Sequence, residues 1–258
     1  MRFKRVCIAL LVLLVGHGLA EEITVAAAAD LQFAFQEAAA RFEKETGQKV
    51  KLTFGSSGNF FAQIQNGAPF DVFFSADIEY PRKLEASGLA EAGTLYPYAT
   101  GKIVLWVPND SMLDVSKGLQ VLLDPGIHTI AIANPAHAPY GRAAVAALQH
   151  EKLYDTLAPK FVLGENISQT ATFVVSGSAD VGIVALSLAL APSLKDKGRY
   201  FEIPSDEYPP IEQGAVILKS SPHQAAARQF MAFLKSSPMR DLLRSYGFFV
   251  PSGPNPAQ

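Results

Sequence analysis

Short apolar runs alternate with longer segments of helical periodicity along most of the chain. In the first cycle, residues 23–28 form an apolar run, and residues 31–45 place apolar side chains every three or four positions. A short apolar run is typical of a buried strand, and the longer periodicity is typical of a helix with one buried face. Asp30 stands between the two, where the N-cap residue of that helix belongs. The chain therefore opens with a predicted strand and a predicted helix.

The same alternation continues to the end of the chain. We predict further strands at residues 49–54, 70–75, 103–107, 129–133, 161–163, 181–184 and 211–218. We predict further helices at residues 60–66, 118–123, 142–149, from about 168 onward, 224–234 and 239–245. Strands that alternate with helices favour mostly parallel sheets with helices on both faces. The predicted fold class is therefore α/β.

The pattern also predicts two lobes. An antiparallel return across residues 96–102 and 208–213 would bring the last part of the chain back to the first lobe. We expect one lobe from residues 21–100 with 214–258, and a second from residues 101–213. Two hinge crossings and a cleft between the lobes suit closure over a ligand. The proline-rich stretch 203–210 fits the second crossing, although its composition fits a plain surface loop equally well.

A turn rich in glycine and serine follows the strand at residues 49–54. Its sequence, Gly55-Ser56-Ser57-Gly58-Asn59, places backbone N–H groups and two hydroxyls where the dipole of the next helix is positive. That is the chemistry of an anion site, but an ordinary capped turn uses the same residue types. Parallel sheets bind ligands beyond the carboxyl ends of their strands, and Ala29 and Asp30 also fall at such an end.

The first twenty residues have the layout of a secretory signal peptide. Three basic residues precede an apolar run at 6–15, and Gly18-Leu19-Ala20 supplies small residues before an expected cut ahead of Glu21. The run of about ten residues is too short to span a bilayer, which needs roughly twenty, so a membrane anchor is the less favoured alternative. The one cysteine, Cys7, lies inside this segment, and the mature chain is expected to have no thiol chemistry.

Composition narrows the class of protein further. The chain has 258 residues, 49% hydrophobic and 18% charged, which is enough for one large or two modest domains with real cores. Its formal net charge is −2, and loss of the three basic residues of the leader makes the mature chain about −5. A mildly acidic exported protein is a poor candidate for binding nucleic acid or an anionic membrane.

Enzyme signatures are absent from the sequence. There is no Gly-x-Ser-x-Gly elbow, no phosphate loop ending in Gly-Lys-Ser/Thr and no Gly-x-Gly-x-x-Gly fingerprint. Asp71 and Asp77 flank a strand, where carboxylates usually cap or face solvent rather than form a glycosidase pair. The five histidines show no ligand spacing: His17, His128, His137, His150 and His223. We expect no catalytic residue, no cofactor and no direct protein ligand to a metal.

Taken in order, several strand ends resemble those of the molybdate-binding periplasmic proteins of ABC transporters, over essentially the whole mature chain. Any one of these segments is a weak signal, but their order is specific. They are 23–29 (Ile-Thr-Val-Ala-Ala-Ala-Ala), Gly55-Ser56-Ser57-Gly58, 67–77 (Gly-Ala-Pro-Phe-Asp-Val-Phe-Phe-Ser-Ala-Asp), Asn134-Pro135, Ala138-Pro139-Tyr140-Gly141, 164–169 (Gly-Glu-Asn-Ile-Ser-Gln) and 179–184 (Ala-Asp-Val-Gly-Ile-Val). The resemblance implies a two-lobed periplasmic binding protein fold of type II.

The resemblance also implies which residues hold the ligand. In that family the oxyanion lies in the cleft and is bound by hydrogen bonds from helix-start amides and a few hydroxyls. Carried over by position, the contacts are Asp30 with Ala29, Ser57 with Ser56, Tyr140, and the amide of Ile167. Some members place a tyrosine after the Gly-Ile-Val strand, where this chain has Ala185, but a subgroup carries it at the position of Tyr140. Arg142, the one cation in these segments, is expected to face solvent.

Asp30 is the main departure, because the family usually shows serine or asparagine there. Two unit charges about 4 Å apart repel by about 4 kcal/mol at an effective dielectric constant of 20, and a dianion would feel more. One hypothesis is that the carboxylate turns away to cap its own helix while its backbone amide faces the ligand. The other is that the carboxylate accepts a proton from a protonated oxyanion such as hydrogen phosphate or arsenate, which would change the specificity.

The function implied is that of a monomeric periplasmic receptor that captures molybdate or tungstate and delivers it to the permease subunits of an ABC importer. A receptor for phosphate or arsenate is the alternative that Asp30 raises. The ligand-sensing domain of a transcription regulator shares the two-lobed plan, but it would carry a helix-turn-helix in place of a signal peptide. An exported hydrolase is disfavoured because a nucleophile and a base are missing from the sequence.

Overall fold

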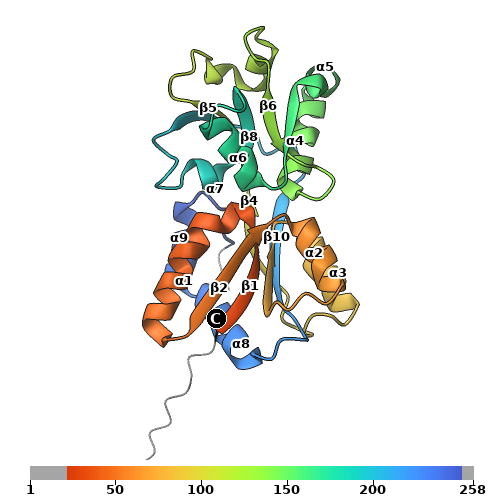
Figure 1. The fold of residues 1–258 in the computed structure, drawn as a ribbon, viewed down its shortest axis with the longest axis vertical. Helices are drawn as coiled ribbons and strands as arrows, with labels where there is room; N and C mark the ends of the chain where they lie inside the picture. The colour runs from red at the N-terminus through yellow and green to blue at the C-terminus, as the bar shows by residue number, and fades with distance from the viewer. Residues whose placement is uncertain (1–21, 252–258) are drawn as a thin grey trace, which may run out of the picture.

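The computed structural model describes residues 22–251, which form two lobes, one above the other in Figure 1. Each lobe is built on a five-stranded sheet. The first sheet has the strand order β2-β1-β3-β10-β4. Its strands are β1 (Glu22–Ala28), β2 (Lys49–Gly55), β3 (Val72–Ser75), β4 (Tyr96–Gly101) and β10 (Ile211–Ile217). The helices of this lobe are α1 (Gln32–Thr46), α2 (Ser57–Gln65), α3 (Glu79–Ala86), α8 (Gln224–Leu234) and α9 (Ser237–Ser245).

The second sheet has the strand order β7-β6-β8-β5-β9. Its strands are β5 (Ile103–Pro108), β6 (Ile130–Ala133), β7 (Phe161–Gly164), β8 (Val181–Ala185) and β9 (Gly198–Glu202). The α-helices are α4 (Pro139–His150), α5 (Tyr154–Leu157), α6 (Ile167–Val175) and α7 (Leu186–Ala189). Three 3₁₀ segments complete the described chain: η1 (Ala29–Leu31), η2 (Val115–Leu123) and η3 (Ala158–Lys160).

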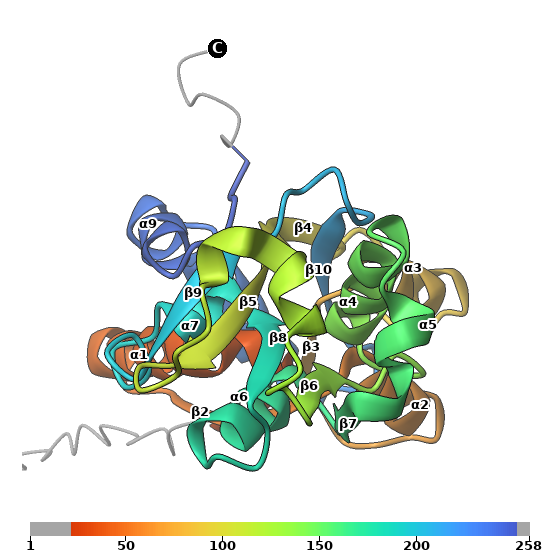
Figure 2. The ribbon, with the colours of Figure 1, turned by 90° about the horizontal axis from the view of Figure 1, so that it is seen from above.

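Both sheets are mixed, with a parallel part that carries the helix crossovers. β1 pairs in parallel with β2 and β3, and β6 pairs in parallel with β7 and β8. β10 and β5 run antiparallel to their neighbours. Helices cover both faces: in Figure 1, α1 and α9 lie on one side of the first sheet and α2 and α3 on the other. Seen from above in Figure 2, α4 and α6 lie on opposite sides of the second sheet.

The chain crosses between the lobes where the sequence predicts the return. β4 and β10 pair antiparallel, with Ile211 opposite Gly101, and β5 begins at Ile103. Pro209 and Pro210 directly precede β10, so the proline-rich stretch leads the chain back into the first lobe. The last helices then pack against α1 in one apolar cluster that includes Phe42 and Phe230. The antiparallel return is confirmed, whereas the residue limits of the two lobes stay a prediction.

Several predicted element boundaries were wrong by a few residues. α2 begins at Ser57 rather than at residue 60, and α4 begins at Pro139 rather than at residue 142. Asp30 is not an N-cap: it lies inside η1, where Ala28 is the N-cap, and Leu31 is the N-cap of α1, with no side-chain cap bond at either. The earlier helix starts matter, because they place the predicted ligand contacts on first helical turns.

The signal peptide predicted at residues 1–20 lies outside the described residues. Among residues 22–251, no helix combines the length and the apolar character that a membrane crossing requires.

Candidate functional site

Several helix starts from the two lobes converge on one small cavity. Lobe one contributes η1 and the start of α2, and lobe two contributes the starts of α4 and α6. The cavity is lined by Ala28, Ala29, Asp30, Gly55, Ser56, Ser57, Ala76, Ala138, Pro139, Tyr140, Asn166 and Ile167. Its volume is about 10 Å³, close to the smallest space that accepts one water-sized group. The six residues predicted as ligand contacts are thus all brought together, although their role in binding stays a prediction.

Ser57 is the best-placed hydroxyl donor in this cavity. It is the first residue of α2 and is fully buried. Its Oγ accepts a hydrogen bond of 2.9 Å from the backbone N–H of Ala76, which leaves the hydroxyl hydrogen free to donate into the cavity. The backbone N–H of a first helical residue has no partner within its own helix. Ser57 therefore offers two donors at the positive end of the helix dipole.

Ser56 has a different role in the structure. Its hydroxyl lies 2.9 Å from Nδ1 of His137, which belongs to the other lobe. The backbone N–H of Gly58 donates across the same gap to the carbonyl of His137 at 2.9 Å. The side chain of Asn59 donates to Glu165, again from one lobe to the other. The serine turn therefore contacts the second lobe as well as the cavity.

The start of α6 completes the wall on the second lobe. Ile167 is its first residue and is buried, and Asn166 caps the helix by accepting a bond of 3.0 Å from the N–H of Gln169. The Asn166 side chain thus satisfies the N–H of Gln169. The N–H of Ile167, at the start of the helix, has no partner within the helix. Ser168 then bonds back to the first lobe, through the carbonyl of Ala29 at 2.9 Å.

Asp30 and Tyr140 are linked inside the cavity wall. The Tyr140 hydroxyl donates to Asp30 Oδ2 at 2.9 Å, and Nε2 of Gln213 donates to the same oxygen at 2.7 Å. Gln213 also donates to the Tyr140 oxygen at 3.0 Å, and its Oε1 accepts from Tyr98 at 2.7 Å. The single hydroxyl hydrogen of Tyr140 is therefore used by Asp30. Asp30 Oδ1 is enclosed and has no hydrogen-bond partner among the described residues.

Burial dominates the acid–base properties of this network. Loss of solvent raises the pKa of Asp30 from 3.8 to about 6, against the lowering effect of the hydrogen bonds from Gln213 and Tyr140. Burial and the nearby carboxylate also hold the pKa of the Tyr140 hydroxyl well above its ordinary value. No lysine or arginine is among the described residues that line the cavity. The hypothesis that the Asp30 carboxylate caps its own helix was wrong, since that side chain bonds Tyr140 and Gln213 instead.

Gln213 is a component of the site region that the sequence reasoning missed. It is 1% exposed and lies on β10, the strand by which the chain returns to the first lobe. A Cβ at Gly101, opposite Ile211 on the neighbouring strand, would overlap the Tyr140 hydroxyl and Nε2 of Gln213. The hinge strands therefore touch the network directly. The sequence signal for this role was a glutamine directly before the apolar end of β10, which also contains Glu212.

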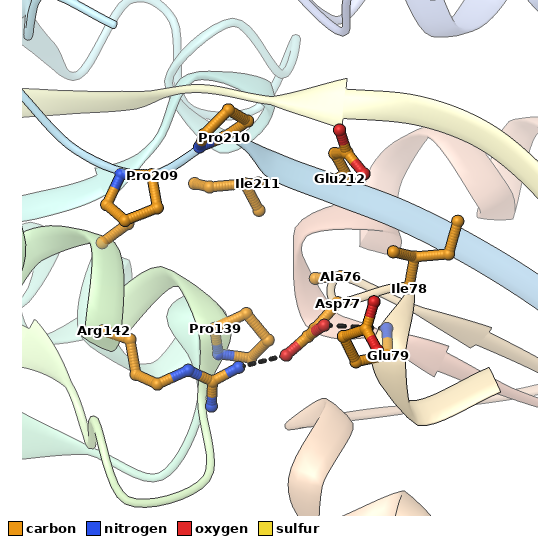
Figure 3. Close-up of a pocket in the computed structure, with 11 residues that line it drawn as sticks. Ala76, Asp77, Ile78, Glu79, Pro139, Arg142, Pro209, Pro210, Ile211 and Glu212 are labelled. Carbon is orange, nitrogen blue, oxygen red and sulfur yellow. Dashed lines mark hydrogen bonds and ion pairs between the residues drawn. The ribbon is translucent and has the colours of Figure 1, made fainter. Parts of the chain in front are cut away.

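A larger cavity of about 350 Å³ opens beside the site, between the lobes (Figure 3). It shares Ala76 and Pro139 with the smaller cavity and has Asp77 and Arg142 on its wall. Nη2 of Arg142 lies 2.5 Å from Oδ2 of Asp77, and the dashed line in Figure 3 marks this pair. Arg142 was expected to face solvent. Its side chain is 40% exposed, but its guanidinium joins the second lobe to the first.

Loss of the Arg142–Asp77 pair should weaken ligand binding modestly. Both side chains are partly exposed, and such pairs contribute about 0.2–1 kcal/mol. We expect Arg142→Gln or Asp77→Asn to lower the affinity by about 1.5-fold to about 5-fold, because each removes a bond that joins the two lobes. Titration calorimetry at low and high salt checks this expectation. If the double variant loses as much as the two single changes added together, the two side chains do not act as a pair.

One cluster outside the cavity has metal-ligand character. His150, Glu151 and Glu207 place potential ligand atoms within 4.8 Å of one another. Exposed groupings of this kind are common without an ion, and none of the three side chains lines the small cavity. The cluster therefore adds nothing to the site between the lobes.

Comparison with known proteins gives one consistent result. The model of the family described as bacterial extracellular solute-binding protein matches residues 23–249. The molybdate-binding protein ModA of Rhodobacter capsulatus is 41% identical over 214 residues, 83% of this chain and 82% of the relative. The corresponding protein of Azotobacter vinelandii is 41% identical over 229 residues, 86% of this chain and 90% of the relative.

Solved structures agree with the sequence comparisons. The periplasmic molybdate-binding protein of Azotobacter vinelandii matches with a TM-score of 0.84 and 38% identity, over 89% of this chain and all of that one. This match confirms the predicted two-lobed periplasmic binding protein fold. The sulfate-binding protein SubI of Mycobacterium tuberculosis matches with a TM-score of 0.69 at 18% identity, over 88% of this chain and 86% of that one. At that identity the likeness shows the fold alone.

Proposed function

The chain belongs to the bacterial extracellular solute-binding proteins, and from this premise we propose that it captures molybdate or tungstate between its lobes and delivers the anion to an ABC importer. The family consists of binding receptors, so the chain is a transport protein and not an enzyme. The observation that carries the proposal is the convergence of helix starts from both lobes on one small cavity, with no lysine or arginine among its described lining residues. Relatives at 41% identity are named as molybdate-binding proteins, which supports the choice of ligand.

The donors around the cavity suit an oxyanion, and the space of about 10 Å³ would have to widen to hold a tetrahedral one. Binding in the micromolar to nanomolar range needs about −8 to about −12 kcal/mol. Roughly six hydrogen bonds to a charged acceptor, at about 1.5–3 kcal/mol each, supply that after the costs of closure and ordering. The hydroxyl and amide of Ser57 and the amide of Ile167 are the donors we assign first. Neutral donors also suit a receptor that has to release its ligand.

Closure of the lobes is part of the proposed mechanism. The two lobes touch through hydrogen bonds near the cavity, such as Gly58 to His137 at 2.9 Å and Ser187 Oγ to the Asp30 carbonyl at 2.8 Å. An anion resting on Ser57 would favour this closed arrangement, because only there does Ile167 also reach it. We propose that the permease subunits of the importer recognise the closed form.

The proposed function also requires export of the protein to the periplasm. We propose that residues 1–20 export the protein to the periplasm as a cleaved signal peptide, and that the mature protein acts as a monomer without a membrane anchor. The family name, which describes extracellular proteins, supports export. The alternatives of a sensing domain of a transcription regulator and of an exported hydrolase receive no support from the comparisons reported above.

A receptor for a protonated oxyanion is the second candidate, and Asp30 is the observation that favours it. An ionised carboxylate in the wall could accept a proton from hydrogen phosphate or arsenate. Titration calorimetry with molybdate, tungstate, sulfate and phosphate separates the two proposals. We expect saturable binding of molybdate and tungstate, and weaker or no binding of sulfate and phosphate. Phosphate that binds more tightly than molybdate would overturn the first proposal in favour of the second.

A further inference from the structure

We propose that Asp30 takes up one proton when the oxyanion binds, and that the resulting neutral acid donates a hydrogen bond from Oδ1 to the anion. The inference rests on the proposed function and adds a proton to it: the receptor would bind its dianion together with one H⁺. No covalent bond other than O–H forms, and the proton comes from solvent.

The two oxygens of the Asp30 carboxyl group differ in their hydrogen bonds. Oδ2 already accepts from the Tyr140 hydroxyl at 2.9 Å and from the amide of Gln213 at 2.7 Å. Oδ1 is enclosed and without a hydrogen-bond partner among the described residues, and Asp30 itself lines the cavity at 2% exposure. A proton therefore has its free position on Oδ1. A buried carboxylate oxygen without a donor is unfavourable unless it is protonated or meets a donor.

The charge of the cavity also favours a proton on Asp30. A dianion in this space would lie beside the Asp30 carboxylate, and among residues 22–251 no lysine or arginine lines the cavity to offset the two charges. Nearby like charge and burial both favour the neutral form of a carboxylic acid. Protonation removes the repulsion and converts Oδ1 from an acceptor, which an oxyanion cannot use, into a donor that it can.

The Tyr140 hydroxyl already donates its hydrogen within the protein. This hydrogen is directed to Asp30, so in this arrangement the tyrosine cannot also donate to the ligand. The donor that the site needs at this corner is then the protonated acid, which Tyr140 and Gln213 hold in place. Tyr140 is a positioning residue in this account rather than a direct ligand contact.

The groups that face Asp30 are otherwise uncharged at neutral pH. Tyr140 of α4 bonds Asp30 directly, and Tyr98 of β4 is connected to it through Gln213. Burial raises the pKa of both phenols well above the ordinary value. Gln213 of β10 and Ser187 of α7 are neutral. His137 contacts Ser56 on the cavity wall, so its contribution to any proton effect has to be tested separately.

The sign of the expected pH dependence follows from these groups. Burial raises the pKa of Asp30 to about 6 in the closed protein without a ligand, and a neighbouring dianion raises that pKa further. The complex therefore holds the proton more tightly than the free, open protein does. Between the two pKa values the affinity should fall about tenfold for each unit of rising pH, and it should level off above the pKa of the complex.

Calorimetric titration with molybdate in two buffers of different ionisation enthalpy tests the proposal directly. At about pH 7 the unmodified protein is expected to take up about one proton per molybdate bound. Asp30→Asn should take up almost none and show a flat affinity between about pH 6.5 and about pH 8.5, since the amide is a neutral donor at every pH. At the alkaline end this variant should bind more tightly than the unmodified protein.

Two control variants make the result specific. Asp110→Asn removes the same charge at an exposed position after β5 and should leave both the proton count and the slope unchanged. His137→Gln should retain the slope. A slope that disappears in His137→Gln and persists in Asp30→Asn would overturn the proposal.

The wild-type measurement stands by itself if Asp30→Asn does not fold. Saturable molybdate binding without proton uptake would overturn this inference and leave the proposed function standing. Absence of saturable heat with both molybdate and tungstate at every pH would overturn the proposed function and this inference with it.

Discussion

Gly58→Ala is expected to lower the affinity for molybdate by about 30-fold to about 900-fold. A Cβ at this position would lie 2.7 Å from the backbone oxygen of His137 and 3.0 Å from its Cα, both in the other lobe. Backbone atoms cannot move aside as a flexible side chain can, so the methyl group keeps the lobes apart. Overpacking costs about 1–3 kcal/mol, and the lost bond from the Gly58 N–H adds about 1 kcal/mol. Titration calorimetry measures the loss.

The stability of the ligand-free variant supplies the control for Gly58. The residue lies in the first turn of α2, where alanine is at least as favourable as glycine. The unfolding temperature without ligand should therefore not fall, while the increase caused by molybdate should shrink. A variant that closes and binds as tightly as the unmodified protein would show that the contact between Gly58 and His137 is not needed for binding.

Ser57→Ala is expected to lower the affinity by about 10-fold to about 150-fold. The Ser57 hydroxyl accepts from the N–H of Ala76, so its hydrogen can donate into the cavity, and a bond to a charged group contributes about 1.5–3 kcal/mol. The same change leaves the buried N–H of Ala76 without its acceptor. We therefore also expect the free energy of unfolding to fall by about 1–3 kcal/mol. Calorimetry and denaturant unfolding measure the two effects separately.

A serine away from the cavity separates these effects from a general cost of losing a hydroxyl. Ser87 follows α3 and bonds the carbonyl of Leu84, so Ser87→Ala should leave the affinity unchanged. If Ser57→Ala binds molybdate as tightly as the unmodified protein does, the assignment of this cavity as the ligand site is wrong.

Much of the fold is predictable from local sequence signals. Continuous apolar runs predict the buried strands, and β5, for example, is buried from Ile103 to Val107. The glycine-serine turn around Ser57 carries its own chemistry, so its place before a helix can be predicted without knowing the fold. Helix starts were placed three residues late at α2 and α4, because Ser57 and Pro139 open those helices with residues that carry no apolar periodicity. Proline is favoured at a first helical position, and this signal was available.

The rest of the site depends on contacts between residues far apart in the sequence. Asp30 is of a residue type favoured at N-caps. Its carboxyl group instead bonds Tyr140, 110 residues later, and Gln213, 183 residues later. The sequence around Arg142 does not indicate that its guanidinium pairs with Asp77, which lies 65 residues earlier. β9 was missed because it is a mostly exposed edge strand of the second sheet and lacks an apolar run. Such pairings are set by how the two lobes meet, which local periodicity does not encode.

The small size of the cavity has a consequence for timing. At about 10 Å³ it has room for about one water-sized group, so a tetrahedral anion can neither enter nor leave unless the lobes part. Each departure then has to wait until the two halves swing apart, so the residence time of the cargo is set by the rate of that swing. A transporter that pulls the halves open would speed unloading without touching any atom that holds the anion.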